Sequence, residues 1–490
     1  MNRSIIVYIL GHVLKIEGAF MLLPCIVALF YRENVGFYYL AVGIFCIGLG
    51  FFITRKKLLN TVFYLKEGCI ATSLSWIIMG LMGCLPLWLS KEIPSFTDAL
   101  FEIISGFTTT GASILNDVEA LSHCTLFWRS FTHWIGGMGV LVFLLAIIPL
   151  SGGSNINLMR AESPGPSVGK LVPKMKSTAR ILYYIYFGLT IIEIIFLLLG
   201  GMSIFETLCT AFGTAGTGGF GFKNDSFASF SPYIQWVVTV FMILFGVNFN
   251  AFYLLLYRNF KKAFKMEEVK YYFLIILVAI IIIFSNILDT SEGIFDALTK
   301  ASFQVASIIT TTGFSTVDFN SWSQTCKTVL VMLMFIGACA GSTGGGIKVS
   351  RFVVLFKTVN KELKSYIHPK SIHKIKIDGK PVEHEVVRSI NVYLITYVLV
   401  FVISLFIISF DGKDLITNFT AISATINNIG PGLELVGPAS NFSLFSTASK
   451  YVLIFDMLAG RLELFPLLIL FHPGAWKDFF LHHHEAKQPL

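Results

Sequence analysis

The chain has 490 residues, of which 55% are hydrophobic and 13% are charged, and its mean hydropathy is +0.74. This composition excludes a soluble globular protein, because one water-exposed domain could not bury so much apolar surface, and it predicts an integral membrane protein. The formal net charge of +8 at pH 7 does not indicate nucleic-acid binding, because the basic residues are concentrated in alternate loops between apolar segments.

Ten stretches of the sequence approach the roughly 20 apolar residues that cross a bilayer as a helix. In chain order, the predicted spans are 16–31, 35–53, 70–89, 126–150, 181–200, 234–257, 271–288, 328–347, 389–410 and 447–471. The first apolar run carries Lys15 and Glu17 and lacks a small-residue cleavage pattern, so we expect a retained helix rather than a signal peptide. These spans predict an all-α polytopic membrane protein.

Basic residues mark every second loop between the predicted spans. They are Arg55, Lys56, Lys57, Lys66, Arg160, Lys170, Lys174, Lys176, Arg180, Arg258, Lys261, Lys262, Lys265, Lys270 and those from Lys348 to Arg388. The positive-inside rule places these loops in the cytoplasm, and with them both termini. The remaining loops then lie on the outer side of the membrane.

A short loop rich in Thr, Gly and Asn recurs four times in these outer segments. Its copies are Thr-Thr-Thr-Gly at 108–111, Gly-Thr-Gly-Gly at 216–219, Thr-Thr-Thr-Gly at 310–313 and Asn-Asn-Ile-Gly at 427–430. After two leading helices (1–66), we expect four units of helix, half-helix, loop and helix, at 67–160, 161–265, 266–365 and 366–490. Four copies of one loop are what a single chain needs to surround an ion path with backbone carbonyls.

The segment before each loop is too short to cross the membrane. These segments are 98–107, 206–212, 296–309 and 417–424, and they begin with Asp98, Glu206, Asp296 and Thr417, residue types that favour helix N-termini. We expect half-membrane helices whose C-termini, with their partial negative charge, point at the pore centre and favour a cation. The alternative is that Gly and Thr serve close helix packing. Packing would distribute them along one helix face, whereas here they form compact runs.

Two further features could obstruct the ion path on the cytoplasmic side of the loops. The outgoing span of unit three contains five glycines within 337–346, followed by Lys348. Each glycine costs a helix about 1 kcal/mol relative to alanine, so we interpret this stretch as a flexible intramembrane gate. The alternative is a loose helix end with Lys348 reaching the interface. In unit four, Arg461 could project into the pore or pair with a carboxylate, and the sequence leaves both open.

Six motifs, taken in order, resemble the Trk/Ktr/HKT superfamily of potassium transporters. They are SGFTTTG at 105–111, WIGGMG at 134–139, TTTGF at 310–314, AGSTGGGIK at 340–348, ATINNIGPG at 424–432 and GRLE at 460–463. The two leading helices make the chain most similar to the TrkH branch. The resemblance covers essentially the whole chain.

The resemblance implies a potassium-selective pore for monovalent cations, one per subunit. The filter would comprise Thr109, Thr110, Gly111, Thr217, Gly218, Gly219, Thr311, Thr312, Gly313, Asn427, Asn428, Ile429 and Gly430. The ion would contact Thr110, Gly111, Gly218, Gly219, Thr312, Gly313, Asn428 and Ile429. In the second loop either Gly218 or Gly219 could be the filter glycine, and we choose Gly219 because Phe follows it, as in the third loop. Gly111 stands where sodium-preferring relatives carry serine, which favours potassium.

The resemblance also implies a gate and partners. The gate would comprise Gly341, Gly344, Gly345, Gly346 and Lys348, with Arg461 facing the pore. Proteins of the TrkH branch form homodimers on a cytosolic ring of TrkA-type nucleotide-binding regulatory subunits, and the stretch 348–388 is too short to be such a domain. We therefore expect a homodimer, a separate regulatory chain, and a lipid-surrounded location in the plasma membrane, as in a bacterial inner membrane. Potassium is the transported ion, and we expect no organic cofactor on this chain and no nucleic-acid partner.

Other functional classes fit the sequence less well. A secondary transporter for an organic solute would have inverted or paired repeats and one or two broken helices, whereas the sequence predicts four units in the same direction. An ATP-driven pump would need a G-x-x-x-x-G-K-[ST] segment, which the sequence lacks, and enzyme activity is not expected. Coupling of uptake to a proton or sodium gradient is the alternative to passive flow. His133 is the titratable candidate for coupling, or else a histidine hydrogen-bonded at a helix interface.

Overall fold

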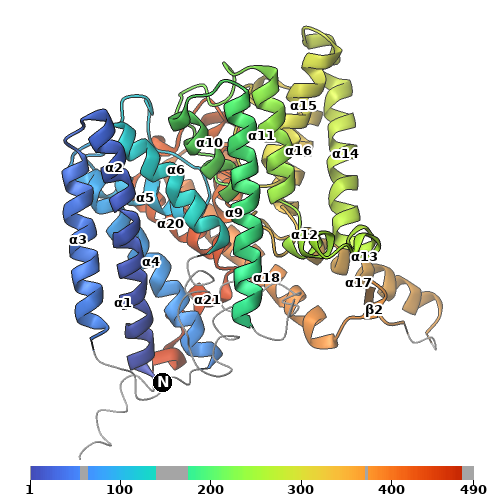
Figure 1. Cartoon of the computed structure of the whole chain (residues 1–490). Helices are drawn as coiled ribbons and strands as arrows, with labels where there is room; N and C mark the ends of the chain where they lie inside the picture. The colour runs from blue at the N-terminus through green and yellow to red at the C-terminus, as the bar shows by residue number, and fades with distance from the viewer. Residues whose placement is uncertain (1, 56–63, 140–174, 370–372, 477–490) are drawn as a thin grey trace, which may run out of the picture.

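The computed structural model describes residues 2–55, 64–139, 175–369 and 373–476. Its long helices stand side by side, with the N-terminus at the lower end of the bundle in Figure 1. Among the described residues, strands are confined to a hairpin of β1 (Lys376–Ile377) and β2 (Lys380–Pro381). The predicted all-α architecture is confirmed.

Two leading spans precede four units. The leading spans are α1 (Arg3–Phe20) with α2 (Leu22–Tyr31), and α3 (Gly36–Ile53). Unit one contains α4 (Leu65–Leu89), α5 (Phe96–Phe107) and α6 (His123–Met138). Unit two contains α9 (Met175–Leu199), α10 (Ile204–Gly216), α11 (Pro232–Phe245), α12 (Phe249–Leu256) and α13 (Phe260–Lys265). Unit three contains α14 (Glu267–Ile287), α15 (Ile294–Ile309), α16 (Gln324–Ile336) and α17 (Val349–Ile367). Unit four contains α18 (His384–Ile408), α19 (Leu415–Ile426), α20 (Thr447–Arg461) and α21 (Phe465–Leu468).

The first span begins earlier than the sequence predicts. Helix α1 starts at Arg3 rather than at residue 16, so Lys15 and Glu17 lie inside it. Hydropathy alone missed residues 3–15 of this helix, which are more than three turns, because polar residues interrupt the apolar run. Isolated glycines in this part of the chain serve packing, since a Cβ on Gly18 would lie 2.5 Å from the Gly43 carbonyl oxygen on α3.

The four short helices α5, α10, α15 and α19 are the predicted half-helices, and we call them the pore helices. Asp98, Glu206, Asp296 and Thr417 all occupy the third helical position rather than the cap. The capping side chains are Ser95, Ser203 and Asp414, each of which accepts a backbone N–H, whereas α15 follows Gly293. Ser203 and Glu206 form a capping box. The predicted starts were therefore misplaced by a few residues, but carboxylates do lie in three of the four first turns.

The outgoing helices of the units are interrupted. Six described helices are long and apolar enough to cross a membrane, or seven if the bent pair α11 and α12 counts as one span. The prediction of a continuous span over 234–257 was wrong, because α11 and α12 meet at 92°. In unit three α16 ends at Ile336, and in unit four α20 ends at Arg461. The second half of the predicted span 126–150 lies outside the described residues.

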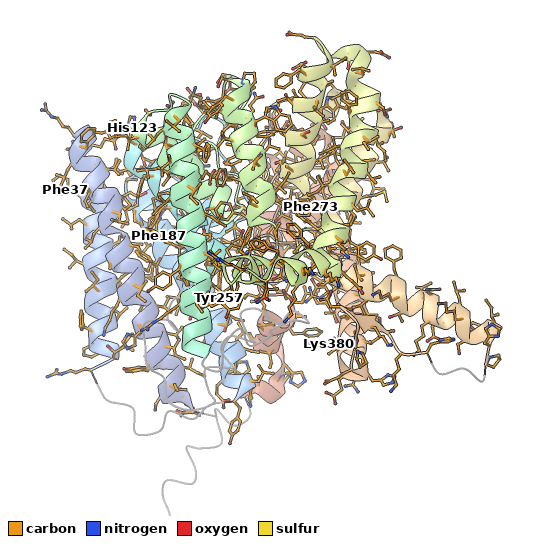
Figure 2. The ribbon with its side chains drawn as sticks, turned by 45° about the vertical axis from the view of Figure 1, so that its right-hand side comes forward. Phe37, His123, Phe187, Tyr257, Phe273 and Lys380 are labelled. Atoms are coloured by element: carbon orange, nitrogen blue, oxygen red, sulfur yellow. The ribbon has the colours of Figure 1, made fainter. Side chains whose placement is uncertain are left out.

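The outer surface of the bundle is apolar. Figure 2 shows Phe37, Phe187 and Phe273 pointing away from their helices, and their side chains are 71%, 53% and 46% exposed. Exposed aromatic side chains of this kind suit contact with lipid chains rather than with water. The interior in contrast contains buried polar residues, and these gather around the pore helices.

Candidate functional site

Each pore helix ends in the same backbone turn. Thr109, Thr217, Thr311 and Asn428 are left-handed, with φ between 53° and 58°. The N–H of the following residue bonds back into the helix over 2.8 Å in every unit: Thr110 to Ser105, Gly218 to Gly213, Thr312 to Ser307 and Ile429 to Ala424. This arrangement satisfies carbonyls at a helix C-terminus. One turn is thus repeated four times in spite of different side chains.

The four loops close a ring. We call residues 109–111, 217–219, 311–313 and 428–430 the filter segments. A Cβ atom added to the last glycine of each filter segment would collide with a carbonyl oxygen of a neighbouring segment. The distance from this Cβ to the oxygen would be 2.1 Å for Gly111 and Gly218, 1.9 Å for Gly219 and Thr312, 2.0 Å for Gly313 and Ile429, and 2.8 Å for Gly430 and Thr110. The contacts run from unit one through units two, three and four and back to unit one. No larger residue fits at these four positions.

The geometry also distinguishes the two glycines of the second loop. Gly219 has φ +82°, in line with +77°, +87° and +102° at Gly111, Gly313 and Gly430. Gly218 instead supplies the carbonyl that touches Gly111. Gly219 is therefore the structural counterpart of the other three glycines, as the following Phe suggested.

The middle threonines of the first and third filter segments, Thr110 and Thr312, direct their hydroxyls behind the ring, whereas the hydroxyls of Thr109 and Thr311 accept hydrogen bonds from below the ring. The Oγ1 atoms of Thr110 and Thr108 lie 2.8 Å apart, as do those of Thr312 and Thr310. Asn427 likewise turns its side chain outward, accepting a hydrogen bond from the Tyr397 hydroxyl at 3.1 Å. The backbone carbonyls are the polar groups that remain for the ion path. Among the described residues, no hydrogen bond reaches the carbonyl oxygens of Thr110, Gly218, Thr312 and Ile429, although buried carbonyls are nearly always paired.

A cavity of about 240 Å³ lies over the outer side of the ring and is lined by Gly111, Gly219, Gly313 and Gly430 together with polar residues. Below the ring lies a second cavity of about 120 Å³, lined by Gly344, Gly345, Gly346, Lys348 and Arg461 among others. The ring of filter segments separates the two cavities. A path across the membrane would pass through it.

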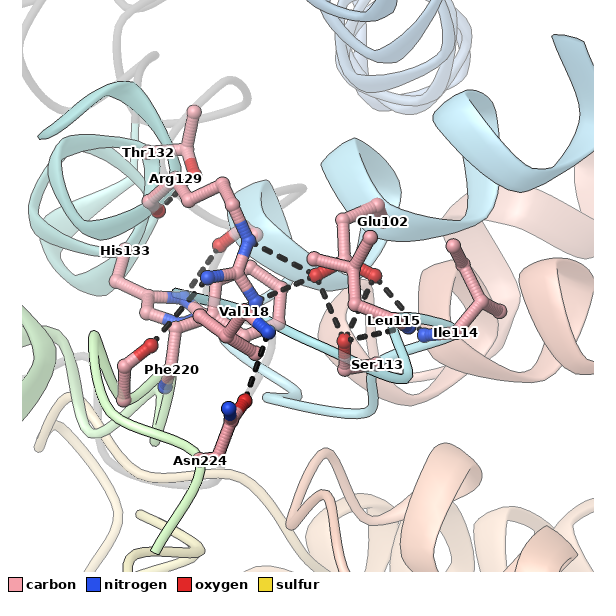
Figure 3. A network of polar contacts seen from close by, with 12 residues as sticks. Glu102, Ser113, Ile114, Leu115, Val118, Arg129, Thr132, His133, Phe220 and Asn224 are labelled. Atoms are coloured by element: carbon pink, nitrogen blue, oxygen red, sulfur yellow. Dashed lines mark hydrogen bonds and ion pairs between the residues drawn. The ribbon is translucent and has the colours of Figure 1, made fainter. Parts of the chain in front are cut away.

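A buried ion pair supports the outer side of the ring (Figure 3). The Arg129 guanidinium binds Glu102 Oε1 through Nε at 2.9 Å and Nη2 at 2.5 Å. Glu102 also accepts hydrogen bonds from Ser113 Oγ and from the Ile114 N–H at 3.0 Å, and so ties the chain after Gly111 to pore helix α5. Sequence reasoning missed this pair, although one acidic and one basic residue in neighbouring apolar segments are a usable signal.

The glycine-rich stretch of unit three lies directly beneath the ring. We call residues 337–348 the gate loop. The Gly345 N–H donates to Thr311 Oγ1 at 2.6 Å, and a Cβ on Gly345 would lie 2.4 Å from the Asn427 oxygen. Lys348 Nζ donates to the Gly344 carbonyl within the loop. Of the predicted gate glycines, Gly344 and Gly345 thus lie against the inner side of the ring, whereas Gly341 lies beside Asn248 and Gly346 beside Gly337.

Arg461 joins the gate loop to two other elements. Its guanidinium donates to the Thr343 oxygen at 2.8 Å, to the Gly137 oxygen at 2.8 Å and to Thr109 Oγ1 at 3.3 Å. Glu463 pairs with Arg351 instead. Arg461 is one of the residues that line the cavity below the ring.

A buried carboxylate that the sequence analysis did not select anchors the gate loop on the other side. Glu268, at the start of α14, accepts the Ala340 N–H at 2.6 Å and the Ser350 N–H at 3.2 Å. Its second oxygen accepts Asn248 Nδ2 at 3.1 Å, at the break between α11 and α12. The Phe249 N–H also donates to the Gly341 oxygen at 3.0 Å. The two broken helices of units two and three are therefore connected.

Side-chain ligands for a metal ion are lacking in the part of the chain that the structure describes, where no three His, Cys, Asp or Glu residues form a suitable group. A cation in the ring would be held by backbone carbonyl oxygens. Such oxygens replace hydration water without a fixed charge that would retain the ion. The pore helices add the partial negative charge of their C-termini.

Comparison with known proteins gives consistent matches. The model of the TrkH family, described as cation transport protein, matches residues 40–478. The chain is 35% identical to the Trk system potassium uptake protein TrkH of Salmonella typhimurium, over 98% of this chain and 100% of that protein. It is 36% identical to the protein of the same name from Vibrio parahaemolyticus, over 97% and 99%. The crystal structure of the potassium transporter TrkH from Vibrio parahaemolyticus superposes with a TM-score of 0.87 at 32% identity, covering 97% of this chain and 100% of that one.

Proposed function

Because the chain belongs to the TrkH family of cation transport proteins, we propose that it is a multi-pass membrane protein that takes up potassium through a selective pore. The observation that carries this proposal is the closed ring of filter segments, whose carbonyls have no hydrogen-bond partner among the described residues. Potassium would replace the missing partner. The names of the relatives, which are potassium uptake proteins, support the choice of ion.

The filter in this proposal consists of the filter segments, which are the residues named from the sequence except Asn427, whose side chain turns outward to Tyr397. The carbonyls of Thr110, Gly218, Thr312 and Ile429 form one layer, because each of them touches the filter glycine of the neighbouring unit. Bulk at any of the four glycines would displace a carbonyl and change the size of the layer. Selectivity for potassium over sodium then follows from the spacing and number of these oxygens.

The gate in this proposal is the gate loop together with Arg461. The loop blocks the inner end of the ring, and Arg461 places a positive charge next to it. A cation can pass only when the loop moves away, and movement must break the hydrogen bonds made by Arg461 and Glu268. Flow in the absence of a partner is expected to be low.

We further propose a homodimer that is regulated by a separate TrkA-type nucleotide-binding subunit on the cytoplasmic side of a bacterial inner membrane. The word "system" in the names of the relatives supports a complex with other components. Basic residues on the cytoplasmic side, among them Arg258, Lys261 and Lys262, are exposed and available for lipid or protein contact.

The test is cation uptake into proteoliposomes that hold the purified chain alone, under an imposed electrical potential and without a proton gradient. Uptake of potassium and rubidium above sodium is the expected result. Equal uptake of sodium and potassium would refute the selective filter. Uptake that requires a proton or sodium gradient would refute passive flow and favour the coupled alternative.

A further inference from the structure

We propose that His133 on α6 is a positioning residue for the second filter segment and that it thereby determines potassium selectivity. Units one and three possess a pair of threonine side chains that unit two lacks; in unit two the His133 ring takes the place of the second threonine and the His133 backbone carbonyl that of the first. This inference rests on the proposed function, because it names a residue that controls the same filter. His133 does not line the ion path itself.

Units one and three support their filter segments with threonine pairs. One threonine of each pair precedes the filter segment, and the other is the middle residue of that segment. The Oγ1 atoms of Thr108 and Thr110 lie 2.8 Å apart, as do those of Thr310 and Thr312. The first threonine of each pair donates back to its pore helix, Thr108 to Ile104 at 2.7 Å and Thr310 to Ala306 at 2.6 Å. The middle residue is thereby fixed to the helix behind the ring.

Unit two cannot form this support, because glycines occupy both positions. Gly216 stands where the other units have Thr108 and Thr310, and Gly218 stands at the middle position. The space is filled by His133. A Cβ on Gly218 would lie 2.1 Å from His133 Cγ, and one on Gly216 would lie 2.2 Å from the His133 carbonyl oxygen. The second loop thus has glycines where the first and third loops have threonines because His133 on α6 leaves no room for side chains there.

Both ring nitrogens of His133 are used, and they connect unit one to unit two. Nδ1 lies 2.8 Å from the Gly106 carbonyl oxygen on pore helix α5. Since a carbonyl only accepts, Nδ1 carries the hydrogen. Nε2 accepts the Phe220 N–H at 3.1 Å, directly after the filter glycine Gly219. The partners assign one neutral tautomer, which explains why His133 is better interpreted as a structural histidine than as a proton carrier.

The ring of Phe220 contacts both His133 and Arg129. The centroid of the His133 ring lies 4.4 Å from that of Phe220, and the Arg129 guanidinium carbon lies 4.1 Å from the same ring. Arg129 is fixed by Glu102, as Figure 3 shows. The second filter segment is therefore positioned from α5 and α6 of unit one rather than by its own side chains.

A shift of this segment would reach the whole ring. Gly219 touches the Thr312 oxygen, and the Gly218 oxygen touches Gly111, so unit two contacts two of the three other filter segments. Loss of the hydrogen bond from the Phe220 N–H to His133 leaves a buried N–H without an acceptor. The free-energy penalty of this loss corresponds to roughly a tenfold change or more in the equilibrium between the regular and the displaced segment. The expected consequence is a less regular ring that discriminates poorly against sodium.

The experiment compares His133→Gln with His133→Asn in the full chain, in proteoliposomes with rubidium and sodium in competition. The Gln amide oxygen reaches the position of Nε2 and can accept from Phe220, whereas the Asn side chain reaches only the position of Nδ1. We expect the rubidium-to-sodium uptake ratio to fall about tenfold in His133→Asn and to be largely kept in His133→Gln. His123→Asn, on the same helix but away from the filter, is the matched control and should keep the wild-type ratio.

A second measurement does not depend on transport. Gly218→Thr alone should lower the midpoint of thermal unfolding, because the new side chain collides with the His133 ring, and adding His133→Ala should restore part of the loss. Equal uptake ratios in His133→Asn, His133→Gln and the wild type, or no coupling between positions 218 and 133, would overturn the inference. If the wild type itself fails to select potassium, the proposed function is refuted, and the unfolding coupling still decides whether His133 supports the second segment.

Discussion

Glu268 provides the most quantitative prediction about gating. The carboxylate is buried and accepts one hydrogen bond from the gate loop, at Ala340, and one from the start of α17, at Ser350. It also holds Asn248 at the break of the unit-two helix. Replacement by alanine removes the acceptor for all three donors. In the position that the structure shows, residues 337–348 then lose this attachment to α14.

The size of the expected increase in uptake follows from the hydrogen bond between the Ala340 N–H of the gate loop and Glu268. A hydrogen bond to a charged group contributes about 1.5–3 kcal/mol. If the Ala340 N–H is hydrated when the loop moves aside, Glu268→Ala raises the open population by roughly ten- to hundredfold. Glu268→Gln keeps an acceptor oxygen but loses the charge, so its effect should be smaller.

The assay is basal rubidium uptake by the chain alone in proteoliposomes. Glu267→Gln is the matched control, because the neighbouring carboxylate pairs with Lys357 and not with the gate loop. We expect uptake to increase in the order wild type, Glu268→Gln, Glu268→Ala. Unchanged uptake in both Glu268 variants, with protein that remains folded and monodisperse in detergent, would refute the proposed role of this carboxylate in holding the gate loop in place.

Three other predictions concern the filter, the inner arginine and the outer surface. Gly313→Ser places a Cβ within 2.0 Å of a neighbouring carbonyl oxygen, at φ +87°, so selectivity against sodium should fall; an unchanged uptake ratio would exclude this glycine from the filter. Arg461→Ala removes a 2.8 Å bond to the gate loop and should raise basal uptake about tenfold; no rise in flux measurements would count against its position as a barrier. Burial raises the pKa of the Glu33 carboxyl, but hydrogen bonds from the backbone N–H groups of Cys124 and His123 and from the His123 ring outweigh it and hold that pKa below its usual range. The stabilisation of the folded protein by the ionised Glu33 carboxylate is therefore fully present above the ordinary glutamate pKa of about 4.3. It is lost as the pH falls through the lowered pKa that Glu33 has in the folded protein. Thermal unfolding at a series of pH values should show this acid loss in the wild type and not in Glu33→Gln, and identical pH profiles would refute it.

The repeated part of the fold could be predicted because repetition adds up weak signals. One Thr-Thr-Thr-Gly loop says little, but four similar loops, each after a short apolar segment, predicted the pore helices and the ring. The five glycines of unit three predicted the interruption after Ile336, since glycine is a poor helix former. Gly219 was chosen over Gly218 as the filter glycine because Phe220 follows it. This choice agrees with the left-handed backbone conformation of Gly219.

The contacts that link distant segments could not be predicted in the same way. The break between α11 and α12 falls at Gly-Val-Asn, residues 246–248, within an otherwise apolar run, and hydropathy does not register it. Glu268 looks like one of several charges in a cytoplasmic loop, because its partners Asn248 and Ala340 are 20 and 72 residues away in sequence. His133 was selected for its chemistry, but its packing against Gly218 depends on tertiary structure.

The most direct test of the central claim is the anomalous diffraction of rubidium in crystals of the chain soaked with rubidium salt. We expect an anomalous peak on the axis of the ring, within coordination distance of the carbonyl oxygens of Thr110, Gly218, Thr312 and Ile429. Absence of a peak there, with rubidium bound instead at side chains elsewhere in the chain, would contradict the assignment of these four segments as the potassium filter.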